Sequence, residues 1–143
     1  MPRDLTPEDR LCLLLARGNF SADVEKCAKD RLEAGPQWGT VLGRAQTHGL
    51  LPLVYHRLRA LNFPSVPQSV QRQLRDFFGV NALRNELLAQ ELVRVLTRLD
   101  AANLPAIPLK GLALAESLYG DPALRSSADL DILIPPERFP ECL

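Results

Sequence analysis

The sequence predicts an α+β fold, in which an N-terminal helical region packs on a small, incomplete mixed sheet. Apolar residues recur at helical spacing through residues 1–102, which predicts helices almost throughout that region. Two short apolar runs, 106–109 and 129–134, flank one more helical segment and predict two strands. The chain has 143 residues, of which 46% are hydrophobic and 24% charged, and these values are typical of one soluble domain.

The first helices are defined by capping residues and glycine stops. Thr6 is a good N-cap before Pro7, and Gly18 ends the first apolar stripe. Ser21 caps the second stripe, which stops before Gly35. These signals place four helices, at about residues 7–17, 22–34, 38–48 and 52–61. Their apolar stripes, including Cys12, Cys27, Leu53, Val54, Leu58 and Leu61, are predicted to form the core.

A much longer helix is predicted from Gln68 to about Ala102. We expect Gly79 to kink or break it, because glycine in a helix costs about 1 kcal/mol relative to alanine. The apolar positions that keep the helical period are Val70, Leu74, Phe77, Phe78, Leu83, Leu87, Leu88, Leu92, Val95, Leu96 and Leu99.

Residues 107–135, which follow this helix, contain the side chains that indicate a chemical function. The order along this segment is strand, tight turn, helix from Leu112 to Tyr119, loop, and strand. Asp129 and Asp131 are two apart in the second strand, so we expect them on one face, about 7 Å apart. Two carboxylates so placed repel each other unless a cation lies between them. Mg²⁺ suits such oxygen ligands, often with substrate phosphates completing its shell.

The first strand supplies an anion site to complement the carboxylates. Lys110-Gly111 lies where the strand turns into the helix, and glycine lets the backbone approach a ligand closely. The free N–H groups of the first helical turn attract anions. Lys110 adds a positive charge, and Arg125 can donate two parallel hydrogen bonds to one phosphate. A phosphate cradle beside metal-binding carboxylates indicates nucleotide chemistry.

Charge and cysteine content indicate which class of ligand the protein binds and in which compartment it lies. Seventeen basic residues balance seventeen acidic ones, which favours small-molecule phosphates over long nucleic acids. The three cysteines form no paired motif, which indicates reduced thiols in a cytoplasmic protein. The start of the chain has no secretory pattern, and no apolar run is long enough for a membrane.

The C-terminal motif resembles a known family. The residues that carry the likeness are Leu109-Lys110-Gly111, then Tyr119, then Arg125-x-x-x-Asp129-Leu130-Asp131-Ile132-Leu133. They resemble the nucleotidyltransferases with a Leu-Lys-Gly signature, which belong to the DNA-polymerase-beta-like superfamily. The resemblance implies that residues 103–143 form the first part of the catalytic core, after a helical region over residues 1–102. It also implies transfer of a nucleoside monophosphate from an NTP to a hydroxyl of a protein, a small molecule or an RNA end. Asp129 and Asp131 would be the catalytic residues and would hold Mg²⁺ or Mn²⁺.

The sequence departs from the superfamily pattern in two places. Lys110-Gly111 replaces the usual Gly-Ser pair, which leaves the phosphate contacts to backbone amides, Lys110, and Ser126 or Ser127. No third carboxylate on a later strand is found, because Glu137 and Glu141 follow Pro136 in what reads as a new helical turn. Two alternatives to an active enzyme therefore stay open: a non-catalytic fragment, and an interaction module like the antitoxin nucleotidyltransferases.

The departures also imply an exposed sheet edge. An open edge invites pairing with another chain. We expect the isolated chain to form a homodimer, to bind a protein partner that covers the edge, to aggregate, or to belong to a longer protein. On its own it is expected to bind Mg²⁺–nucleotide weakly and to transfer nucleotide at a negligible rate.

Overall fold

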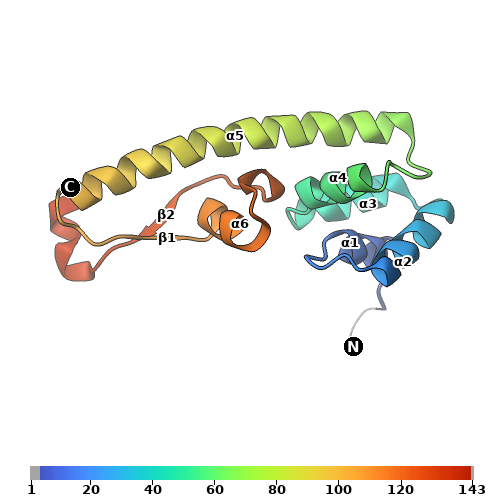
Figure 1. Ribbon diagram of the computed structural model, residues 1–143, viewed down its shortest axis with the longest axis horizontal. Coiled ribbons are helices and arrows are strands. Elements are labelled where there is room, and N and C mark those ends of the chain that lie inside the picture. The colour runs from blue at the N-terminus through green and yellow to red at the C-terminus, as the bar shows by residue number, and fades with distance from the viewer. Residues whose placement is uncertain (1–3, 143) are drawn as a thin grey trace. The chain divides into compact units, whose positions relative to one another are not determined.

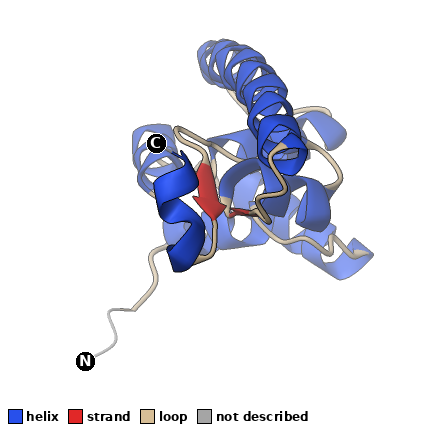
Figure 2. Cartoon of the chain, turned by 90° about the vertical axis from the view of Figure 1, so that its left-hand side faces the viewer, coloured by secondary structure: helices blue, strands red, loops and turns tan. Residues whose placement is uncertain are grey.

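The computed structural model describes residues 4–142, which divide into two compact units with the boundary between Val80 and Asn81. Helices dominate both units, and the two strands are short (Figure 2). The elements in chain order are α1 (Pro7–Leu15), α2 (Ala22–Glu33), α3 (Trp38–Thr47), α4 (Leu51–Ala60), α5 (Gln68–Ala101), β1 (Ile107–Leu109), α6 (Gly111–Tyr119), the 3-10 helix η1 (Pro122–Leu124), β2 (Asp131–Leu133) and the 3-10 helix η2 (Pro136–Cys142). This composition confirms the α+β prediction.

The first unit is a helical cluster with its own apolar core. Helices α1 to α4 and the beginning of α5 contribute to it, and the predicted core positions of α4 are all buried. Cys12 is buried as predicted, whereas Cys27 is only half-buried, so its assignment to the core was wrong. The largest fully buried side chains of the unit are Leu11, Leu15, Leu32, Val41, Pro52, Val54, Leu58 and Leu74.

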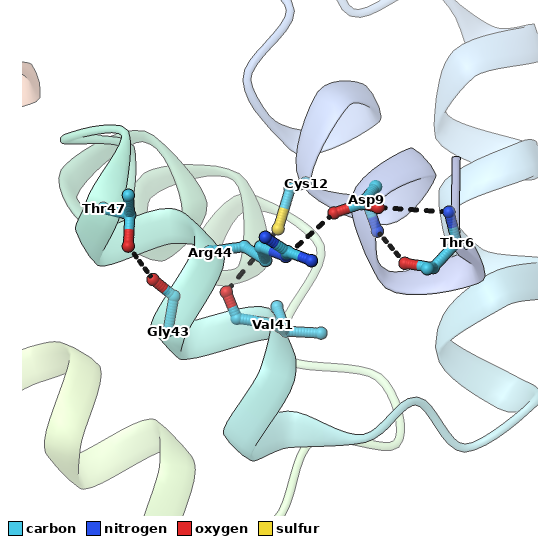
Figure 3. A network of polar contacts seen from close by, with 7 residues as sticks. All are labelled: Thr6, Asp9, Cys12, Val41, Gly43, Arg44 and Thr47. Carbon is cyan, nitrogen blue, oxygen red and sulfur yellow. Dashed lines mark hydrogen bonds and ion pairs between the residues drawn. The ribbon is translucent and has the colours of Figure 1, made fainter. Parts of the chain in front are cut away.

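The start of α1 is fixed by a capping box that also links α1 to α3 (Figure 3). The backbone N–H of Asp9 donates to Thr6 Oγ1, and the backbone N–H of Thr6 donates to the Asp9 carboxylate, each at 3.1 Å. The same carboxylate pairs with Arg44 Nε at 3.2 Å. The Thr6 backbone N–H is the largest cause that lowers the pKa of Asp9 below its usual value. Nearby, Cys12 Sγ donates to the Val41 carbonyl at 3.6 Å, and burial raises the pKa of that thiol.

Replacing Asp9 with asparagine is expected to destabilise the first unit at neutral pH and to have little effect in acid. Because the folded pKa of Asp9 is lowered, its stabilising contribution is complete above the usual value of 3.8 and disappears as the pH falls through the folded pKa. Urea unfolding of the parent and of Asp9→Asn at neutral pH and at about pH 2.5 measures this. A destabilisation of the same size at both pH values would contradict the capping role.

Helix α5 runs without a break from Gln68 to Ala101, so the predicted break at Gly79 is absent (Figure 1). Its N-terminal apolar positions Val70 and Leu74 are buried as predicted. Leu83 and Leu87 are 64% and 59% exposed, so their assignment to the core was wrong. The positions that are buried in their place along this part of the helix are Asn81 and Asn85, which are 4% and 1% exposed.

The second unit contains a two-stranded antiparallel sheet and the helix that joins its strands. The pairing aligns Ile107 with Leu133, Pro108 with Ile132, and Leu109 with Asp131. Strands at 106–109 and 129–134 and a helix at 112–119 were predicted, so the prediction of neighbouring strands is confirmed.

The second strand is shorter than predicted, because it begins at Asp131 and not at Asp129. The reason lies in its partner. After Leu109 the chain turns away at Lys110 into α6, so Asp129 and Leu130 have no strand opposite them. Asp129 instead lies in a bend just before β2.

The predicted division at residues 102 and 103 stays a prediction, since the compactness of the two units does not report where a catalytic core begins. Within residues 4–142, no helix combines the length and the apolar composition that a membrane span requires.

Candidate functional site

The site is organised by the turn between β1 and α6. Lys110 has φ 52° and ψ −150°, and Gly111 has φ 39°, so both residues lie in the left-handed half of backbone space. For lysine this conformation costs about 1–3 kcal/mol, and strain of this kind gathers at functional sites. Glycine adopts it at little cost. The turn therefore explains why the sequence places a glycine directly after Lys110.

The strand register brings Lys110 to Asp131. Leu109 pairs with Asp131, so the next residue, Lys110, extends just beyond the aspartate. Its Nζ lies 3.4 Å from Asp131 Oδ2, while the side chains are 71% and 39% exposed. An exposed pair of this kind contributes at most about 1 kcal/mol to stability. The pair places the Lys110 ammonium beside the Asp131 carboxylate.

Gly111 faces Ser127 and the backbone of Asp129. A Cβ built on Gly111 would lie 3.4 Å from Ser127 Oγ and 3.8 Å from the Asp129 carbonyl oxygen. Ser127 is 7% exposed, and its hydroxyl is buried without a hydrogen-bond partner. No side chain caps the first turn of α6, so its leading N–H groups are also left without a cap. A free hydroxyl and free amide donors thus meet at the start of one helix.

Two asparagines hold the segment that leads to Ser127, and sequence reasoning missed both. Asn85 Nδ2 donates to the carbonyls of Pro122 at 2.7 Å and Arg125 at 2.6 Å. Asn81 Nδ2 donates to the carbonyls of Ala123 at 2.9 Å and Arg125 at 3.4 Å. The available signal was their spacing, since two asparagines four residues apart share one helix face.

The predicted site residues are therefore only partly brought together. Lys110 contacts Asp131, and Gly111 contacts Ser127 beside the Asp129 backbone. Arg125 is anchored through its carbonyl, and its Nε is buried with no hydrogen-bond partner. Ser126 is exposed.

The carboxylates of the site are of the kind that binds hard metal ions. Carboxylate oxygens are the ligands that hard divalent cations prefer, and Asp131 already accepts the Lys110 ammonium. The two aspartates therefore suit Mg²⁺ or Mn²⁺ in kind. Within residues 4–142, no group of three or more His, Cys, Asp or Glu side chains is placed to hold a metal. The candidate ligands among the described residues are Asp129 and Asp131.

Comparison with known proteins identifies the family of the chain. Residues 34–143 match the model of a family described as uncharacterised nucleotidyltransferase. Comparisons with curated proteins and with solved structures found no match. The match covers most of the chain and includes β1, α6 and β2. This chain therefore belongs to that nucleotidyltransferase family.

Proposed function

We propose that the second unit binds a nucleoside triphosphate with Mg²⁺ and transfers its nucleoside monophosphate to an acceptor hydroxyl. The observation that carries the proposal is the cradle of Gly111 and Ser127, where an unpartnered buried hydroxyl meets the uncapped start of α6. Such a start binds phosphate through backbone N–H groups and the helix dipole. The family assignment supports the same class of substrate.

The reaction proposed is an in-line substitution at the α-phosphorus. The acceptor oxygen forms a bond to that phosphorus and loses its proton to solvent. The bond from the α-phosphorus to the oxygen that bridges to the β-phosphate breaks, and pyrophosphate leaves with the electron pair. When bound, Mg²⁺ would neutralise charge on the phosphates. The acceptor is a hydroxyl of a protein, a small molecule or an RNA end.

The residues of the chain would bind and orient the triphosphate. The N–H groups at Gly111 and the Ser127 hydroxyl donate to phosphate oxygens, and Arg125 offers its free Nε. The Lys110 ammonium would leave the Asp131 carboxylate and pair with a phosphate oxygen of the nucleotide. The Asp131 carboxylate would then be available to the metal ion. The ion pair is exposed, so this exchange costs at most about 1 kcal/mol.

A pair of glycine variants tests the cradle. Gly111→Ala is expected to weaken Mg²⁺–nucleotide binding at least tenfold, because a Cβ in van der Waals contact with Ser127 Oγ would keep a phosphate from that hydroxyl, and a hydrogen bond to a charged phosphate contributes about 1.5–3 kcal/mol. Gly120→Ala is the matched control: Gly120 also has positive φ, at 67°, but its Cβ would meet nothing within 4 Å. Both variants carry backbone strain, and only the first fills the cradle. Equal affinities in a calorimetric titration of the two variants would contradict the proposal.

One observation favours an interaction role beside catalysis. Ile107 and Leu133 are paired in the sheet and are 59% and 53% exposed, so the strands present apolar side chains to solvent. A two-stranded sheet is marginally stable by itself. We propose that a second copy of the chain covers this pair, and sedimentation velocity is expected to show a concentration-dependent dimer. A monomer at all concentrations, in a stable fold, would contradict it.

A further inference from the structure

A second candidate binding site lies in the first unit, between α1 and α2. It is a surface pocket of about 540 Å³, within the size range of small-molecule sites. It lies in a part of the chain that precedes the family match, which begins at residue 34. The lining residues are Arg10, Leu13, Leu14, Arg17, Cys27 and Arg31.

The helical period explains why these side chains converge. Arg10, Leu13 and Leu14 are three and four residues apart, so they lie on one face of α1. Cys27 and Arg31 are four apart on α2 and share a face in the same way. The two helices pack against each other in the first unit.

The charged residues that line the pocket are all basic. Its lining holds three arginines and no carboxylate. Within residues 4–142, the guanidinium groups of Arg10, Arg17 and Arg31 form no ion pair. Arg31 Nε is moreover buried without a hydrogen-bond partner. By contrast, Arg44 of the same unit pairs with Asp9.

The remaining lining is apolar. Leu13 is 53% exposed and lies on the helix face opposite the fully buried Leu11 and Leu15, so its side chain is available to a ligand. A ligand that fits has an apolar body to cover the leucines and an anionic group to satisfy the arginines. We propose that this pocket binds a small organic anion, a phosphate or a carboxylate on an apolar body, independently of the nucleotide site.

The half-buried thiol of Cys27 reports on occupancy. The experiment follows alkylation of Cys27 by N-ethylmaleimide, quantified by peptide mapping of the full chain. Phenyl phosphate, phenylacetate or benzyltrimethylammonium is added as the probe. Titration calorimetry with the two anions measures the same binding without relying on the thiol.

The expected result is that at least one anion slows alkylation of Cys27 in a saturable way, whereas the cation does not. Which anion protects better distinguishes a phosphate from a carboxylate ligand. Arg10→Gln with Arg17→Gln is expected to weaken this binding about tenfold or more. The control, Arg59→Gln with Arg84→Gln, removes the same charge from exposed positions outside the pocket and is expected to leave it unchanged.

Three results would overturn the proposal. They are the absence of binding by both anions in calorimetry, equal protection by the cation, and undiminished anion binding in the Arg10→Gln, Arg17→Gln variant.

Discussion

The double variant Asp129→Asn with Asp131→Asn is expected to lose Mg²⁺-dependent nucleotide binding while the chain stays folded. The two carboxylates are the candidate metal ligands in the second unit, and each charged contact is worth about 1.5–3 kcal/mol. Their joint loss corresponds to a fall in affinity of more than about a hundredfold. Stability should change by less than about 1 kcal/mol, because the interaction that is lost is the exposed Lys110–Asp131 pair.

The matched control is Glu86→Gln with Glu116→Gln. It removes two negative charges from exposed positions of the same unit and leaves the site intact. Calorimetric titration of Mg²⁺ with nucleotide into the parent, the double variant and the control makes the comparison. Unchanged affinity in the Asp129, Asp131 variant would refute the metal assignment.

The second large effect is expected from Asn85→Ala. The substitution leaves the partly buried carbonyl of Arg125 with only the longer bond from Asn81 and deprives the partly buried Pro122 carbonyl of its side-chain donor. Loss of a donor to such a carbonyl costs about 1–3 kcal/mol for each group, so a total of roughly 2–4 kcal/mol is expected. Ser127 lies two residues after Arg125, so nucleotide affinity should fall as well.

Hydrogen exchange localises this effect. Amides of residues 121–127 are expected to exchange faster in Asn85→Ala, while those of α1 to α4 keep their protection. Gln90→Ala is the control on the same helix, since Gln90 is exposed and bonds only to Glu86. Unchanged exchange at 121–127 in the Asn85 variant would show that the asparagines do not order this segment.

The elements that sequence predicted well are those with a local signal. Thr6 and Pro7 fix the start of α1, and the interrupted apolar runs fix the two strands and α6 between them. Helix α5 was predicted over nearly its full length, because its apolar pattern persists over many turns. A single glycine did not break it, since a local cost of about 1 kcal/mol is small beside the packing of a long helix.

The features that sequence did not predict depend on long-range pairing. Leu83 and Leu87 fit the helical period, but the buried face of α5 there carries Asn81 and Asn85, which bond to carbonyls about 40 residues away. The start of β2 depends on where β1 ends, which propensity alone cannot place. The meeting of Gly111 with Ser127 likewise follows from the fold and not from their spacing.

Binding of Mg²⁺–nucleotide by the second unit is tested most directly by calorimetric titration. ATP, GTP, CTP and UTP are each titrated into the parent chain, with Mg²⁺ and with a chelator. At least one nucleotide is expected to bind saturably, to require Mg²⁺, and to bind about tenfold or more weakly to Gly111→Ala. Two results would contradict the proposed function: no binding of any of the four nucleotides to a folded chain, or binding that neither requires Mg²⁺ nor changes in Gly111→Ala.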